Sequence, residues 1–134
     1  MIEINNLSKT SLNRNFFSTV AKKVLSGENR ETEKISLAFI NKEEIKKLNK
    51  KFRNKNKPTD VLSFNLGEKD YLGEIVICPE IVKENAKKYG VTIKYETTKV
   101  FVHGILHLLG YDHEKLEEAE DMESRQEKYL SIVI

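Results

Sequence analysis

Apolar and polar residues follow two different periods along the chain, and each period predicts one kind of secondary structure. Alternating or dense apolar runs predict strands over residues 1–5, 33–40, 61–65 and 71–78. Apolar residues spaced by three or four positions predict helices over residues 11–26, after Asn41, and over 79–89, 94–109 and 115–130. This order predicts an α+β fold with about four strands in one small sheet and about five helices.

Residues with special backbone preferences mark the expected helix ends. Asn41 can cap the helix that follows it, and Glu44, three positions later, gives a pattern close to a capping box. Gly27, Gly90 and Gly110 are expected to end helices, because glycine readily adopts the left-handed conformation that follows a last turn.

The helix after Asn41 is expected to bury a stripe formed by Ile45, Leu48 and Phe52, which are spaced like one face of a helix. Phe52 and Tyr111 could instead stack on a nucleic-acid base, since aromatic rings serve this purpose in proteins that bind single strands. The apolar stripe favours the core position for Phe52, and a core position is also favoured for Tyr111.

The composition fits one domain over residues 1–134, since 39% of the residues are apolar, 33% are charged, and no linker or repeat interrupts them. No apolar run approaches the roughly 20 residues that span a bilayer, and the first residues lack the basic start and apolar stretch of a signal peptide. The single cysteine, Cys78, has no partner for an internal disulfide. These features predict a cytoplasmic protein.

The net charge of +2 conceals two segments of opposite sign. Residues 42–57 contain eight basic and two acidic side chains, whereas residues 112–127 contain two basic and eight acidic ones. Each segment could be no more than a solvated helix face. The composition therefore argues only against a uniformly basic nucleic-acid-binding protein.

All three histidines lie in one eleven-residue string, HGILHLLGYDH, which runs from His103 to His113. His103 and His107 are four positions apart in a predicted helix, so both rings project from one face. Gly110 lets the chain turn back, which allows His113 to be a third ligand. The spacing matches the metal-binding part of the long zincin motif, and three neutral histidines around Zn²⁺ leave a fourth position for water. The alternative, partly buried helix histidines with polar contacts, explains one histidine better than three at this spacing.

Gly104 stands where zinc peptidases carry their general-base glutamate. Peptide hydrolysis is therefore disfavoured, whereas metal binding is not. Because glycine inside a helix costs about 1 kcal/mol relative to alanine, we expect substrate or another backbone to approach closely there.

Arg53 is a candidate phosphate-binding residue at the end of the basic helix. The guanidinium group can hold a phosphate through two parallel hydrogen bonds, which lysine does less specifically. The alternative is a surface arginine or an ion pair. Asp60, which follows Pro58 and Thr59, is either a site residue or a turn and cap residue, and the structural role is favoured.

The sequence resembles the YbeY-type bacterial endoribonucleases, which take part in ribosomal RNA maturation. The resemblance is closest from Leu48 to about Met122 and includes the string from His103 to His113. Other matching residues are Asn49, Phe52, Arg53, KPTDVLSF at 57–64 and LGEIVIC at 72–78. The sequence departs from the family pattern at Glu74, where aspartate is common, and at Asn65, where proline is common.

The resemblance implies a small mixed sheet flanked by helices and one Zn²⁺ per chain, held by His103, His107 and His113. It also implies a functional Arg53 in a basic channel for single-stranded RNA. Arg53 and His103 are the expected catalytic residues, and Asp112 is either a base or a residue that orients an imidazole. The other residues expected to contact RNA are Lys46, Lys50, Lys51, Lys55 and Lys57.

Three functional hypotheses follow. The first is a zinc-dependent, single-strand-specific endoribonuclease acting in 16S 3′-end maturation and ribosome quality control, with the small ribosomal subunit and its proteins as partners. The second is a ribosome-assembly factor that binds RNA and has a mainly structural zinc site. The third is a metallohydrolase of peptides or small molecules, against which Gly104 and the basic segment both argue.

Overall fold

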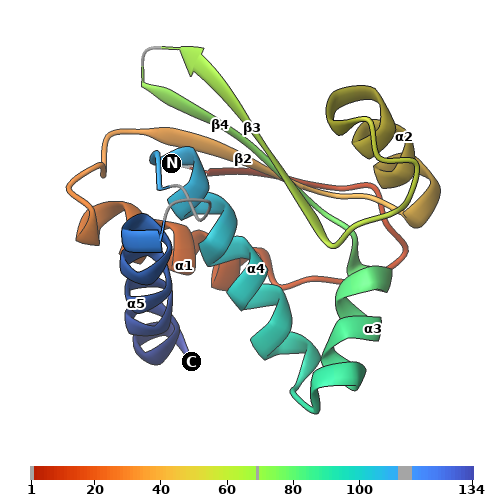
Figure 1. Cartoon of the computed structure of the whole chain (residues 1–134). Helices are drawn as coiled ribbons and strands as arrows, with labels where there is room; N and C mark the ends of the chain where they lie inside the picture. Colours follow the sequence, from red (N-terminus) through yellow and green to blue (C-terminus); the bar gives the residue numbers. More distant parts are fainter. Residues whose placement is uncertain (1, 69, 112–115) are drawn as a thin grey trace.

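The computed structural model describes residues 2–68, 70–111 and 116–134 and contains four strands and five helices in these ranges (Figure 1). The strands are β1 (Ile2–Asn6), β2 (Lys34–Phe39), β3 (Val61–Glu68) and β4 (Tyr71–Ile77). The helices are α1 (Arg14–Gly27), α2 (Lys42–Arg53), α3 (Pro79–Tyr89), α4 (Ile93–Leu108) and α5 (Leu116–Val133). The predicted α+β class and element order are confirmed.

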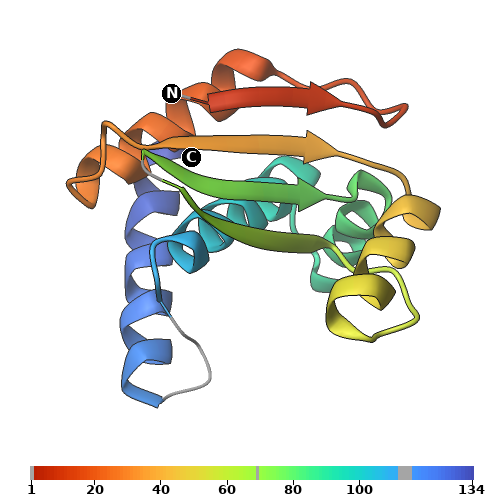
Figure 2. The same cartoon turned by 90° about the horizontal axis from the view of Figure 1, so that it is seen from above.

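The four strands form one mixed sheet in the order β1-β2-β4-β3, and Figure 2 shows them side by side in this order. β1 pairs in parallel with β2, and β2 pairs in parallel with β4, so that Ile4, Leu37 and Ile75 lie in one row. β3 pairs antiparallel with β4 and forms one edge of the sheet. The mixed sheet implied by the family resemblance is therefore present.

The two faces of the sheet are covered by different helices (Figure 1). One face contributes side chains such as Leu37 and Ile75 to a large core shared with α1, α4 and α5. The other face contributes Leu62 and Val76 to a smaller core with Ile45 of α2. This arrangement follows from the period of two along a strand, which sends alternate side chains to opposite faces.

The predicted helix ends are largely confirmed. The Asn41 side chain accepts a hydrogen bond from the Glu44 backbone N–H at 2.9 Å, as a cap should. Gly90 follows α3 with φ of 68°, a conformation that glycine adopts without strain. Gly110 has φ of 103° and lies two residues beyond the end of α4. Within the described ranges, no helix has the length and apolarity needed to cross a membrane.

The predicted core position of Phe52 is wrong, because 57% of this residue is exposed. Ile45 is fully buried, but the next inward position of α2 is taken by Asn49, which is 1% exposed. The Asn49 amide donates a hydrogen bond to the Lys57 carbonyl at 2.9 Å and so ties the following loop to the helix. Phe52 in the last turn rests its edge against the Phe64 ring, with centroids 5.1 Å apart.

Candidate metal and RNA-binding site

The paired histidines lie on α4, whose other faces are buried in the core by residues such as Phe101 and Ile105. The ring centroids of His103 and His107 are 5.5 Å apart, and the ring planes are inclined by 67°. Two imidazoles that bind one tetrahedral ion at about 2.0–2.1 Å place their centroids roughly 5 Å apart. The separation of the two rings is close to this value, as expected for histidines four residues apart on one helix face.

Gln126 of α5 orients one of these histidines. Its side-chain oxygen lies 3.0 Å from His103 Nδ1, and the residue is 9% exposed. An N–H at Nδ1 leaves Nε2 unprotonated and available to a metal, which is how partners of this kind prepare ligands. The sequence analysis did not identify Gln126 as a site residue. The signal was a polar side chain within the buried stripe that Met122 and Leu130 form on α5.

The third predicted ligand, His113, and the predicted base or orienting residue, Asp112, lie outside the described residues. Within residues 2–68, 70–111 and 116–134, no group of three ligand side chains is placed to hold a metal ion. The three-histidine site therefore stays a prediction.

Gly104 faces the sheet, and the expectation of a close approach by substrate or backbone needs correction. A Cβ at this position would lie 3.0 Å from Ile75 Cγ2 and 3.2 Å from Ser63 Oγ, so the close neighbours are side chains. The glycine therefore lets α4 pack tightly on β3 and β4. A side chain at this position would meet the sheet.

A groove of about 330 Å³ runs along α4 from His103 towards α3. Its lining residues are Asp60, Val61, Asn85, Tyr89, Glu96, Lys99, Val100, His103 and Gln126. The Asp60 carbonyl accepts a hydrogen bond from the Cys78 backbone N–H at 2.9 Å, a main-chain contact that does not distinguish between the two predicted roles of this residue. Asp60 also lines the groove, and its charge lies near Glu96, so both predicted roles stay open.

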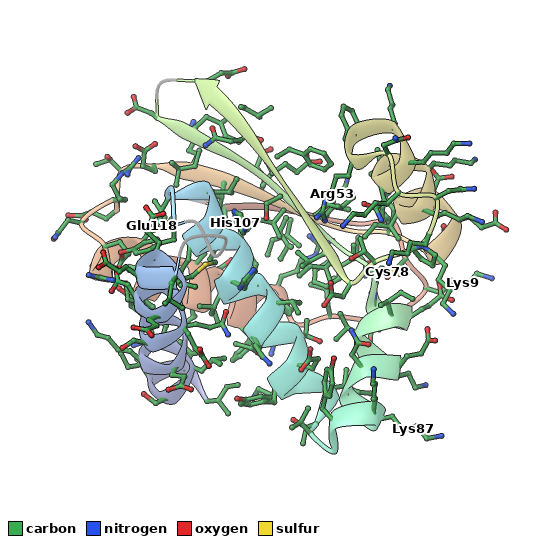
Figure 3. All side chains as sticks on the ribbon, viewed as in Figure 1. Lys9, Arg53, Cys78, Lys87, His107 and Glu118 are labelled. Atoms are coloured by element: carbon green, nitrogen blue, oxygen red, sulfur yellow. The ribbon has the colours of Figure 1, made fainter. Side chains whose placement is uncertain are left out.

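Arg53 and the predicted RNA-binding lysines lie on α2 and the loop after it, against the opposite face of the sheet from α4. Arg53 is exposed and does not line the groove beside His103. In Figure 3 Arg53 and His107 appear on either side of β3. The predicted basic residues are all exposed, and in the described ranges none of them forms an ion pair with an acid: Lys46, Lys50, Lys51, Arg53, Lys55 and Lys57.

A buried carboxylate anchors the chain just after α4. Glu28, whose side chain is 6% exposed, accepts hydrogen bonds from Tyr111 at 2.6 Å, from Arg125 at 2.8 Å and from Tyr129. Burial alone would raise the pKa of Glu28, but the three donors outweigh it and lower the pKa. Burial and the bond to Glu28 raise the pKa of Tyr111 to about 12, so its hydroxyl stays a donor. Tyr111 packs against the core, as favoured from the sequence.

These features define an α+β protein built around a helix with paired histidines, and a polar network around Glu28 anchors the chain just after that helix. The family model described as Endoribonuclease YbeY matches residues 3–133, and the chain belongs to this endoribonuclease family. The resemblance seen in the sequence is thereby confirmed.

Individual relatives agree with this assignment. A Thermotoga petrophila protein named Endoribonuclease YbeY is 46% identical over 100 residues, which cover 74% of this chain and 67% of that protein. A protein of the same name from Bdellovibrio bacteriovorus is 43% identical over 114 residues, which cover 84% and 75%. The solution structure of a Thermotoga maritima protein superposes with a TM-score of 0.77 at 38% identity, covering 99% of this chain and 89% of that one.

Proposed function

We propose that the chain is a zinc-dependent endoribonuclease that cuts single-stranded RNA, with the 3′ end of 16S ribosomal RNA as a substrate. The observation that carries this proposal is the imidazole pair of α4, with centroids 5.5 Å apart, at the end of a groove in a chain of the YbeY family. The proposed partners are ribosomal RNA and proteins of the small ribosomal subunit, and the proposed compartment is the cytoplasm.

His103, His107 and His113 would hold the zinc ion, with Gln126 fixing the ring of His103. When bound, zinc lowers the pKa of a coordinated water towards about 7 and polarises a phosphoryl oxygen. The Arg53 guanidinium would donate two parallel hydrogen bonds to a phosphate of the same RNA strand. Its positive charge would offset the negative charge that develops on that phosphate during cleavage.

Cleavage by extensively purified protein tests the proposal. We expect a single-stranded RNA to be cut, the matching duplex to resist, and a chelator to stop the reaction until zinc is restored. The products are resolved on a denaturing gel. Equal cleavage with and without chelator, after metal-free purification, would exclude a metal-dependent enzyme.

Arg53→Glu is expected to weaken RNA binding without loss of zinc or of fold, because the side chain is exposed and distant from the core. Loss of a charge-assisted contact and introduction of a repelling carboxylate should lower affinity by about 10-fold or more at low salt. Fluorescence anisotropy with a labelled single strand measures this change.

The matched control for Arg53→Glu is Lys22→Glu, which makes the same change of charge at an exposed position of α1. We expect this control to bind RNA nearly as the wild type does. Equal weakening by both variants would assign the effect to overall charge and reject a specific phosphate contact by Arg53.

A role in ribosome assembly without catalysis is the second candidate, and the placement of α2 favours it. The exposed basic residues of α2 lie apart from the groove beside His103, so they can bind RNA independently of the metal. The exposed acidic face of α5, which includes Glu117, Glu120 and Glu127, suits a basic ribosomal protein. RNA binding that survives complete removal of zinc, combined with absence of cleavage, would favour this function.

A further inference from the structure

Glu96 is a largely buried residue that lines the groove, and its carboxylate has no partner in the described residues. It is 4% exposed, and in residues 2–68, 70–111 and 116–134 no donor forms a hydrogen bond or ion pair with it. Burial raises the pKa of Glu96. The positive charge of Lys99 lowers this pKa, and the negative charge of the nearby Asp60 raises it. The carboxylate oxygens are not among the fully buried polar atoms that lack a partner, so they remain accessible from the groove and can bind a ligand there.

The helix dipole does not explain the burial of Glu96. Glu96 lies in the first turn of α4, where a negative charge is favourable. Glu80 lies in the first turn of α3, where the helix dipole stabilises its negative charge equally, and yet it is exposed. It also accepts a hydrogen bond from the Lys42 backbone N–H. The dipole therefore accounts for a negative charge in this turn but not for the position of Glu96 in the groove beside His103.

The groove supplies the other groups that a nucleotide needs. Glu96 and His103 are seven residues apart on one face of α4, which is about 10 Å along the helix. Tyr89, which is 56% exposed, lies at the groove and offers a ring on which a base can stack. Lys99 provides a positive charge, and the Asn85 amide provides a donor and an acceptor. The volume of about 330 Å³ lies within the range of small-ligand sites.

We propose that this groove is a nucleotide subsite beside the metal centre, in which Glu96 recognises the Watson–Crick edge of guanine. The inference rests on the proposed endoribonuclease function, because it assigns a base preference to the RNA substrate. Guanine presents two neighbouring N–H donors on this edge, which match the two acceptor oxygens of one carboxylate.

The other bases fit the carboxylate less well. Adenine and cytosine place a single amino donor next to an acceptor nitrogen, so each makes one hydrogen bond. Uracil flanks its single N–H with two carbonyl oxygens, which repel the carboxylate. Guanine also carries an oxygen that can accept a hydrogen bond from the Asn85 amide. The expected order of affinity is guanine first, adenine and cytosine next, and uracil last.

Titration of the whole protein with GMP, AMP, CMP and UMP tests the subsite directly, without any need for cleavage. A well-made bidentate contact discriminates by about fivefold or more, so GMP should bind at least about fivefold more tightly than UMP. Amide NMR shifts should map GMP to the groove. Equal affinity for the four nucleotides, or GMP shifts confined to other surfaces, would overturn the proposal.

Glu96→Gln keeps the size of the side chain but replaces one acceptor oxygen with a donor. In this variant we expect the ratio of the affinity for GMP to the affinity for UMP to fall towards one. Glu80→Gln is the matched control, since it removes the same charge from the first turn of another helix, and it should keep the wild-type ratio. An unchanged ratio in Glu96→Gln would reject the role of Glu96. The wild-type ranking tests the subsite even if this variant folds poorly.

Cleavage of short RNAs that differ at one position separates the two proposals. Metal-dependent cleavage with no preference for guanine at any position, together with equal nucleotide binding, would reject the subsite and leave the proposed function intact. A GMP preference that depends on Glu96, in a protein that cuts no RNA, would support the subsite and reject the proposed nuclease. Magnesium binding that is lost in Glu96→Gln, without nucleotide discrimination, would assign the carboxylates to a cation and overturn the subsite.

Discussion

Replacing His107 with alanine is expected to abolish metal-dependent RNA cleavage and to lower the zinc content from about one ion per chain to almost none. The substitution removes one of the two imidazoles that α4 brings together with centroids 5.5 Å apart. Changes to residues behind the ligands already cost about 10- to 100-fold in metal affinity, so loss of a ligand should exceed about 100-fold. Elemental analysis after dialysis against a defined free zinc concentration measures the effect.

Gln126→Leu is expected to weaken zinc binding less than His107→Ala does. It removes the hydrogen bond to His103 Nδ1 while both histidines remain. We expect zinc affinity to fall by about 10- to 100-fold, so excess zinc should restore cleavage in this variant but not in His107→Ala. Circular dichroism of both variants controls for folding. Equal cleavage by wild type and His107→Ala would point to a contaminating nuclease and reject the metal-dependent assignment.

The second large effect is expected for Glu28→Ala, which should lower the free energy of unfolding by about 2–4 kcal/mol, mainly because two tyrosine hydroxyls lose their acceptor. The substitution removes the shared acceptor of Tyr111, Tyr129 and Arg125 and leaves their polar groups without it. Urea denaturation followed by circular dichroism measures the loss. Tyr129→Phe removes one hydrogen bond of the network and should cost about 1 kcal/mol.

The pH dependence of stability follows from the lowered pKa of Glu28. The unfolded chain binds a proton at this carboxylate more readily than the folded protein does. The stabilisation is therefore complete above the unfolded pKa of about 4.3 and is lost as the pH falls through the folded pKa.

Glu28→Gln should flatten the acid side of the stability curve, whereas the exposed Glu31→Gln should leave its shape unchanged. The curves come from urea denaturation between about pH 7 and pH 3. A wild-type curve whose acid side matches that of Glu28→Gln would show that the carboxylate has the same pKa in the folded and unfolded states.

The elements of the fold were accessible from the sequence because each depends on a local signal. Asn41 caps α2 through its own side chain, and the glycine at position 90 ends α3 in the conformation expected of it. The pairing of His103 with His107 is equally local, since four residues of helix place both rings on one face.

The features that sequence reasoning missed depend on contacts between distant positions. Gln126 lies 23 positions from His103, and Glu28 lies 83 positions from Tyr111, so no local period connects them. Phe52 was misplaced for a related reason, because the rotation of α2 on the sheet gives the inward position to Asn49. The burial of Glu96 also depends on how α3 and β3 approach α4, and the charge pattern alone does not contain this information.

The position of β3 at the edge of the sheet has a consequence for the shape of the substrate. α2, which ends at Arg53, covers one face of the sheet, and α4, which carries His103 and His107, covers the other. An RNA strand that contacts both helices must therefore bend around β3. A double helix resists bending on this scale, as the persistence length of about 150 base pairs for DNA illustrates. An unpaired strand makes the turn easily. Selection for single strands would then arise from the path that the edge of the sheet imposes on the RNA, in addition to any chemistry at the metal.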